Sequence, residues 1–251
     1  MAVNTSYAAV HYNAGFIVLS YLVSLVGCIT TLELLHRRTS RRGLYNWYLL
    51  VSSCICMGSV GIWSMHFIGN RAIEILSENE AGTQILYSGG CTAASFFLPI
   101  VVLLVAFYLL GVLDRGNWYF IGFSALLTGT AVCGMHYVGQ LGISNYSISY
   151  SGQYVAGAGA IAVFASFIAF SVFFKLRDTW KESWWKRSLC AAVLAGAVSG
   201  MHWTAAAGTN YRFLGMPTAP RIRSREQTVI VCAVLLRFSS LPGLAIANAL
   251  Y

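Results

Sequence analysis

Long runs of apolar residues are the feature that most limits what this chain can fold into. Six of them are about 20 residues long or longer, the length at which a helix crosses the hydrocarbon core of a bilayer. These six runs lie at about 15–35, 47–69, 87–113, 118–141, 154–174 and 188–208. A seventh candidate at about 228–251 is weaker, because Arg237, Pro242 and Gly243 interrupt it. We therefore predict an all-α integral membrane protein, a seven-transmembrane-helix bundle in the lipid bilayer with a weaker closing helix.

The composition excludes the soluble classes of protein. Of the 251 residues, 57% are hydrophobic and only 10% are charged, whereas a soluble domain carries about 25% charged residues. A compact soluble core cannot hide this much apolar surface. All seven cysteines lie within the apolar runs, so we interpret them as small buried residues and not as a disulfide framework.

Positive charge marks the expected orientation in the membrane. The net charge is +8, and basic residues cluster at 37–42 and 175–187, between apolar runs. Cytoplasmic loops carry such an excess of Lys and Arg, so we expect the N-terminus outside and the C-terminus inside, at the plasma membrane. These clusters explain the charge without nucleic-acid binding. Two N-x-S/T sequons, at Asn4 and Asn145, then fall outside and are glycosylation candidates.

Three of the runs end in the same short motif, a Met-His pair followed by an aromatic residue. The pairs lie 70 and 66 residues apart, and an Asn-Trp-Tyr tripeptide begins the second and fourth runs alike. The motifs are Met65-His66-Phe67, Met135-His136-Tyr137 and Met201-His202-Trp203. We infer a threefold internal repeat of a helix pair within a single domain spanning 1–251, with repeats at about 15–69, 87–141 and 154–208.

The three motifs are expected at one depth near the outer face, because the second helix of every pair runs outward in this topology. If these helices face one another, three imidazoles and three thioethers form a cluster. That ligand set suits copper better than magnesium or calcium, and ionisable residues inside a membrane are costly and usually functional. Zinc held by three histidines, haem or another redox group, and a purely structural hydrogen-bonding role are the alternatives.

In these motifs the chain resembles the MHYT family of seven-helix membrane domains, which carry three Met-His-aromatic repeats. The resemblance covers about residues 7–250 and includes the sequence at 61–64 that leads into the first motif. It implies a membrane sensor whose copper ion, near the outer face, detects a diatomic gas (O2, CO or NO) or a redox state. The metal ligands that it implies are Met65, His66, Met135, His136, Met201 and His202.

The chain also departs from the bacterial members of that family. Those members often have a second methionine five residues after the first, where this chain has Asn70, Gln140 and Ala206. The two amides lie four residues after the histidines of their repeats, so we expect them to orient the imidazole rings from the second shell. His11, just before the first run, is an additional candidate ligand. The sequons and the absence of a cyclic-dinucleotide enzyme segment resemble the stand-alone MHYT proteins of fungi.

These features favour a non-enzymatic membrane sensor that signals to an unknown cytoplasmic partner. A gas bound at an open coordination position would change helix packing and so bias a partner at the inner loops. One alternative is a copper or small-solute transporter, although no ladder of ligands continues inward, and Glu33 near the inner end is expected to pair with an arginine. Another is a structural membrane protein without metal. The last run contains no lysine, which excludes a retinal Schiff base.

Overall fold

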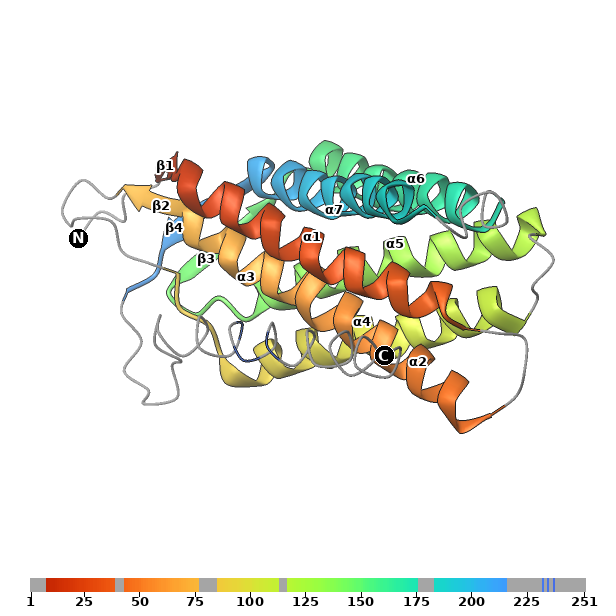
Figure 1. Ribbon diagram of the computed structural model, residues 1–251. Coiled ribbons are helices and arrows are strands. Elements are labelled where there is room, and N and C mark those ends of the chain that lie inside the picture. The colour runs from red at the N-terminus through yellow and green to blue at the C-terminus, as the bar shows by residue number, and fades with distance from the viewer. Residues whose placement is uncertain are drawn as a thin grey trace, which may run out of the picture.

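The computed structural model is an elongated bundle of helices capped at one end by short strands (Figure 1). It describes residues 8–38, 43–76, 85–112, 117–175 and 183–215, together with the isolated positions 232, 234 and 237. Within these residues, six helical spans are long and apolar enough to cross a membrane. The predicted all-α membrane architecture is therefore confirmed for six helices. The seventh, at 228–251, lies outside the described residues except for positions 232, 234 and 237, which are helical.

The six spans follow the expected apolar runs closely. Five are single α-helices, and the second span, Leu44–Ala72, is built from four consecutive segments. The single helices are α1 (Ala14–His36), α4 (Gly89–Val112), α5 (Trp118–Leu141), α6 (Gly152–Lys175) and α7 (Trp184–Ala207). The second span contains α2 (Leu44–Ile55), the π-helix η1 (Cys56–Ser64), α3 (Met65–Gly69) and the 3₁₀ turn η2 (Asn70–Ala72).

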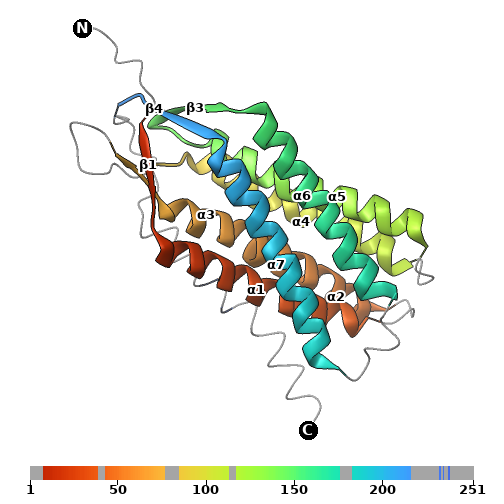
Figure 2. The same ribbon diagram turned by 90° about the horizontal axis from the view of Figure 1, so that it is seen from above.

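Consecutive helices pack as neighbours around the bundle. The α1 helix packs on the second span, α4 packs on α5, α6 packs on α7, and α7 returns to α1, so the ring of helices closes (Figure 2). The second helices of the three pairs also contact one another, through η1 and α3 with α7 and through η1 with α5. This arrangement directs the C-terminal ends of α3, α5 and α7 toward a common axis.

The π-helix η1 immediately precedes the Met65-His66 pair and is the main irregularity of the bundle. A π-helix places residues differently from an α-helix and leaves backbone groups that need other partners. The Gly61 carbonyl accepts a hydrogen bond of 2.8 Å from Ser24 Oγ on α1. Gly27 lies directly against Gly61, so α1 and η1 approach at a point where a Cβ atom would collide with backbone. The close contact between these glycines seats η1 against α1.

Four short strands form the capped end of the bundle, which is the end where α3, α5 and α7 terminate. Strand β1 (Ala9–Tyr12) pairs antiparallel with β2 (Ile73–Leu76), and β3 (Tyr146–Tyr150) pairs antiparallel with β4 (Thr209–Phe213). The strands β1, β3 and β4 lie together beyond the helix ends (Figure 2). The sequence does not predict these strands, because the partner of each strand lies about 60 residues away along the chain.

Asn145 lies buried at the capped end, where it takes part in a hydrogen bond. Its side chain is fully buried, and Asn145 Oδ1 accepts a hydrogen bond of 2.9 Å from the Leu86 backbone N–H. A glycan requires an accessible asparagine amide, so this folded structure argues against the glycosylation expected at Asn145. The other sequon asparagine, Asn4, lies outside the described residues.

The opposite end, here called the basic end, carries the expected ion pairs. Glu33 on α1 contacts Arg37 on the same helix at 3.0 Å and Arg187 on α7 at 3.1 Å. This confirms the predicted pairing of Glu33 with arginine, and the second contact links the first helix of the bundle to the last described one.

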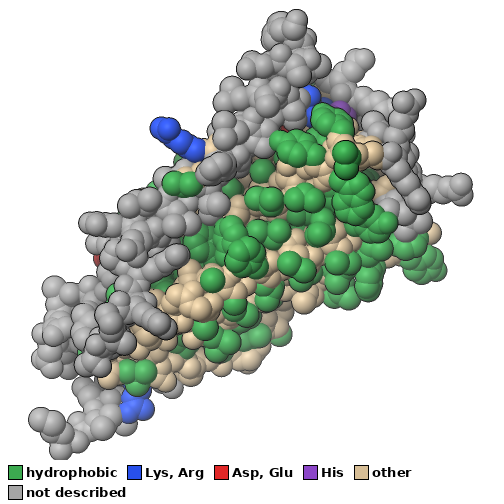
Figure 3. Space-filling model, turned by 90° about the horizontal axis from the view of Figure 1, so that it is seen from below, with side chains coloured by type: hydrophobic (Ala, Val, Ile, Leu, Met, Phe, Trp, Pro, Cys, Tyr) green, Lys and Arg blue, Asp and Glu red, His purple; other side chains and the backbone are tan. Residues whose placement is uncertain are grey.

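The surface between the two ends is apolar, as a lipid-facing surface requires. Figure 3 shows one face with hydrophobic side chains spread along its length and few Lys or Arg side chains. At the basic end, large aromatic residues are exposed at the helix starts, as in the interfacial belts of membrane proteins. They include Trp47, Tyr48, Trp118, Tyr119, Trp184 and Trp185. All seven cysteines are free, and five of them are buried.

Candidate metal centre

Three histidines from distant parts of the sequence meet inside the bundle near its capped end. His66 on α3, His136 on α5 and His202 on α7 are each fully buried. Their ring centroids lie 4.9, 5.1 and 5.2 Å apart, and the rings are close to perpendicular. One nitrogen atom from each ring lies within 4.8 Å of the others, as a shared metal ion would require. We call these residues the histidine triad.

The nitrogen atoms of the triad have few hydrogen-bond partners. His66 Nδ1 lies 3.3 Å from His202 Nδ1, and His66 Nε2 lies 3.1 Å from the amide of Asn70. Among the described residues, both nitrogens of His136 and Nε2 of His202 are buried without a hydrogen-bond partner. A buried polar atom without a partner costs free energy, so the triad presents lone pairs that a bound cation would satisfy.

The spacing within the triad fits a transition-metal ion. Two imidazole nitrogens bound at about 2.0–2.1 Å to one tetrahedral ion lie roughly 3.3 Å apart. The separation of His66 Nδ1 and His202 Nδ1 is 3.3 Å. Neutral imidazole is a good ligand for Zn, Cu, Fe and Ni, whereas Mg and Ca prefer oxygen. The arrangement can therefore hold an ion of the first group.

Two glycines let the imidazole rings approach the neighbouring helices. A Cβ atom built on Gly69 would lie 2.7 Å from His202 Nε2, and one on Gly139 would lie 2.8 Å from His66 Nε2. Both glycines occur three residues after the histidine of their own motif, and Ala205 occupies that place in the third repeat. The bare backbone of the first repeat thus accommodates the imidazole of the third, and the bare backbone of the second repeat accommodates the imidazole of the first.

The aromatic residue of each motif packs between its histidine and the capped end. The rings of these aromatic residues lie 4.8 to 5.0 Å from the adjacent imidazoles. Each of them also contacts a tyrosine outside the membrane-spanning helices: Phe67 contacts Tyr87, Tyr137 contacts Tyr150, and Trp203 contacts Tyr12. The repeated third residue therefore joins the triad to the strands above it.

Three further residues were predicted to lie at the site: Asn70, Gln140 and His11. Asn70 approaches both His66 and the hydroxyl of Tyr87, at 3.1 and 2.6 Å. Gln140 is fully buried, and its amide interacts with the hydroxyl of Tyr211. The structure does not bring His11 to the triad. It lies on β1, where its side chain is mostly exposed and its Nδ1 is 3.5 Å from Glu74.

The three motif methionines are fully buried and belong to the hydrophobic core. They are Met65, Met135 and Met201. Their sulfur ligation therefore stays a prediction.

Tyr87 is a candidate functional residue that the sequence analysis did not find. It precedes α4 and belongs to no sequence motif. Its relation to the triad is visible only in the structure, where it contacts Asn70 and Phe67.

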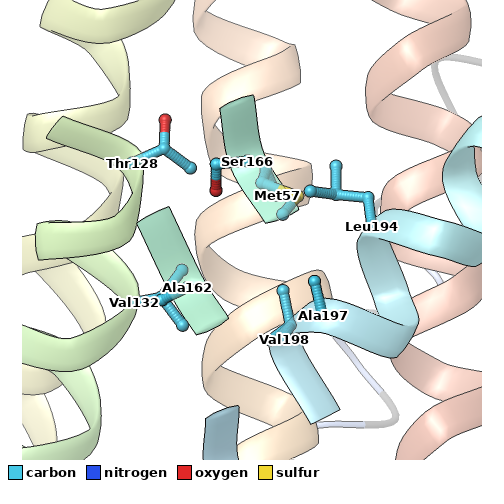
Figure 4. A pocket seen from close by; sticks show the side chains of 8 residues that line it. All are labelled: Met57, Thr128, Val132, Ala162, Ser166, Leu194, Ala197 and Val198. Carbon is cyan, nitrogen blue, oxygen red and sulfur yellow. The ribbon is translucent and has the colours of Figure 1, made fainter. Parts of the chain in front are cut away.

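A small apolar space lies further into the bundle, between η1, α5, α6 and α7. Figure 4 shows its lining, in which Thr128 and Ser166 are the only hydroxyl-bearing side chains. Val132 and Val198 of this lining lie one helical turn from His136 and His202. The space is too narrow to admit a water molecule.

Comparison with known proteins finds two copies of a family repeat in the chain. Residues 60–122 and 129–184 match the model of the MHYT family, described as "Bacterial signalling protein N terminal repeat". The chain is 29% identical over 199 residues to "Signaling protein YkoW" of Bacillus subtilis, which covers 78% of this chain and 24% of the relative.

Two relatives from Pseudomonas aeruginosa are also similar. "Bifunctional diguanylate cyclase/cyclic di-GMP phosphodiesterase MucR" is 28% identical over 80% of this chain and 28% of its own length. "Cyclic di-GMP phosphodiesterase NbdA" is 24% identical over 77% of this chain and 24% of its own length. The chain thus spans about a quarter of the length of these relatives. No solved structure matches it. On its repeats and its relatives, the chain belongs to the MHYT family of membrane signalling proteins.

Proposed function

We propose that the chain is the sensory membrane part of a signalling system and that its histidine triad holds a metal ion, for which copper is our candidate. The observation that carries this proposal is the convergence of three buried imidazoles whose nitrogens lie within 4.8 Å of one another. Buried histidines inside a membrane are usually functional. The names of the relatives, which describe signalling proteins, support the sensory role.

The residues present fit the proposed ion. His66, His136 and His202 would supply the nitrogen ligands, and the nitrogens of His136, which have no hydrogen-bond partner among the described residues, are atoms that a cation would satisfy. The three motif methionines, Met65, Met135 and Met201, lie on the same helices as these histidines. Their thioethers are softer donors than imidazole, and for this reason we choose copper. A bound copper ion would supply a coordination position for O2, CO or NO, or a change of redox state.

The architecture offers a route from the triad to a partner. Each ligand lies on a different helix pair, and these pairs pack against one another throughout the bundle. A change in ligand position would alter the packing of α3, α5 and α7 and reach the basic end, where Glu33 joins α1 to α7. In this proposal the basic end faces the cytoplasm at the plasma membrane, the N-terminus lies outside, and the chain acts on an unidentified cytoplasmic partner without being an enzyme itself.

The cyclic di-GMP activities in the names of two relatives support a signalling output of this kind. Because the chain covers only about a quarter of those proteins, their activities belong largely to segments that it does not match.

Transport of copper or a small solute is the alternative. A transporter needs polar groups or water along a path through the bilayer. Below the triad, the small space next to Val132 and Val198 is lined mainly by apolar side chains and admits no water molecule. This observation favours a sensor over a transporter.

The test is the metal content of the protein purified in detergent, with electron paramagnetic resonance spectra of the copper-loaded form. The joint substitution of His66, His136 and His202 by Ala should abolish binding. His11→Ala is the matched control, because His11 is a histidine of the capped end that lies outside the triad. Unchanged metal content in the triple variant would overturn the metal site. Uptake of copper into proteoliposomes would favour transport.

A further inference from the structure

The amide of Asn70 lies between the triad and the capped end. One atom of this amide, at the Nδ2 position, is 2.6 Å from the hydroxyl oxygen of Tyr87 and 3.1 Å from His66 Nε2. The other atom, at the Oδ1 position, has no hydrogen-bond partner among the described residues. Asn70 is 4% exposed and Tyr87 is 9% exposed, so neither relies on bulk water.

The lengths of these contacts indicate how the amide is oriented. Oxygen and nitrogen of a carboxamide are nearly the same size, so its orientation follows from the hydrogen-bond network. A contact of 2.6 Å to Tyr87 lies below the range of N–H···O bonds, roughly 2.7–3.2 Å, and within that of O–H···O bonds, roughly 2.5–3.0 Å. A half-turn of the amide places the Asn70 oxygen at both contacts. It then accepts one hydrogen bond from the Tyr87 hydroxyl and one from His66 Nε2–H.

This orientation decides the tautomer of His66. A proton on Nε2 leaves the Nδ1 lone pair of the neutral ring free, and Nδ1 is the atom that faces His202, at 3.3 Å. In metal sites, the hydrogen bond made by one ring nitrogen sets which nitrogen binds the ion. The amide of Asn70 therefore selects Nδ1 as the ligand atom of His66.

Tyr87 is held independently of the triad. Its backbone forms an antiparallel bridge with Ile143, which follows α5, and its ring packs on Phe67 at 4.9 Å. Burial raises the pKa of the Tyr87 hydroxyl, so the hydroxyl stays protonated at neutral pH and able to donate. Contacts at the capped end thus hold the Tyr87 hydroxyl, which is the hydrogen-bond donor to Asn70, in place.

The other two histidines do not have this connection among the described residues. Gln140, the counterpart of Asn70 in the second repeat, interacts with the Tyr211 hydroxyl, but neither ring nitrogen of His136 has a hydrogen-bond partner among the described residues. Ala206 occupies the position in the third repeat and has no polar side chain. His66 is therefore the triad member whose orientation is set from outside.

We propose that Tyr87, acting through Asn70, is a positioning residue that fixes His66 in the Nε2–H tautomer and directs its Nδ1 into the triad. The identification of Nδ1 as a metal ligand rests on the proposed function. The tautomer itself is a property of the metal-free protein and is measurable without any metal.

The experiment is solid-state ¹⁵N NMR of [¹⁵N]histidine-labelled, metal-free protein in bilayers, because protonated and unprotonated ring nitrogens resonate far apart. Loss of signals in His66→Gln assigns the His66 ring. In the wild type, Nε2 of His66 should be protonated and Nδ1 unprotonated, in one tautomer. Tyr87→Phe and Asn70→Leu should give a mixture or the opposite tautomer. Asn70→Asp, which keeps an acceptor oxygen at both contacts, should keep Nε2 protonated.

Tyr211→Phe is the matched control for Tyr87→Phe. Tyr211 is also a buried tyrosine of the capped end, and its hydroxyl interacts with Gln140 of the second repeat. This variant should leave the His66 signals unchanged, and a cooperative melting transition in every variant reports a folded bundle. A protonated Nδ1 on His66 in the wild type, or a wild-type His66 tautomer in Tyr87→Phe, would overturn the proposal.

Metal titration of the same proteins separates this proposal from the proposed function. If the triad binds metal, Tyr87→Phe should lower the metal affinity by about 10-fold. This is the low end of the range for loss of a residue that orients a metal ligand. Tyr211→Phe should leave the metal affinity unchanged. If no protein in the series binds metal, the proposed function fails, while the tautomer result still decides the role of Tyr87.

Discussion

Substitution of Gly69 by alanine should disturb the triad without unfolding the bundle. The added Cβ would lie 2.7 Å from Nε2 of His202, 3.1 Å from its Cδ2 and 3.4 Å from its Cε1. Ordinary contacts begin at about 3.4 Å, so the imidazole must retreat by roughly 0.7 Å. Metal-ligand distances tolerate only about ±0.2 Å. The displaced His202 ring therefore leaves ligand range of an ion that the other two histidines hold.

The expected cost to stability is moderate. Overpacking a filled interior typically costs about 1–3 kcal/mol, and alanine recovers up to about 1 kcal/mol of helix propensity relative to glycine. We therefore expect Gly69→Ala to remain folded, with a small fall in melting temperature. Metal affinity should fall by about 10-fold or more, because even indirect disturbance of a ligand costs about 10–100-fold.

The assay is metal titration of detergent-purified protein, with the melting temperature measured in parallel. Gly196→Ala is a matched control, because Gly196 lies on the same helix as His202 and a Cβ there meets no atom within 4 Å. Gly159→Ala on α6 is a second control of the same kind. Wild-type metal affinity in Gly69→Ala, with the controls also unchanged, would refute the argument that bare backbone at Gly69 positions His202.

Three further outcomes follow from the contacts. Glu33→Gln weakens the ion pairs with Arg37 and Arg187, which are partly exposed, so the free energy of unfolding should fall by less than about 1 kcal/mol; a larger fall in a denaturation assay would contradict this. Asn145→Ala removes the acceptor of the Leu86 N–H and should destabilise by about 1–3 kcal/mol, and an unchanged melting temperature would show that the bond contributes nothing. Copper at about 100 times its dissociation constant should stabilise the metal-free protein by about 2.7 kcal/mol; a melting temperature indifferent to both copper and chelator would argue against binding.

The helices were predictable because the bilayer imposes a length. The predicted run at 118–141 has the same bounds as α5, where Asn117 caps the helix start by accepting a hydrogen bond from the Tyr119 N–H. The positions of His66, His136 and His202 also followed from the sequence, because three repeats of one motif on parallel helices place equivalent residues at one depth.

The capped end was not predictable in the same way. Its strands are short and polar, and their pairing joins segments such as β1 and β2 that lie far apart in the sequence. Tyr87 belongs to no repeat and reaches the triad only through its contacts in space with Asn70 and Phe67. The position of His11 has the same origin, because strand pairing places it opposite Glu74 at the surface. Long-range pairing of polar segments has no local signal comparable to an apolar run.

X-ray absorption at the metal edge tests the central claim most directly. The account predicts that copper-loaded wild-type protein shows imidazole nitrogens from His66, His136 and His202 at about 2.0 Å from the ion, and that these signals disappear in the triple alanine variant. An ion coordinated without histidine nitrogen, or an unchanged spectrum in the triple variant, would contradict the claim that the triad is a metal centre.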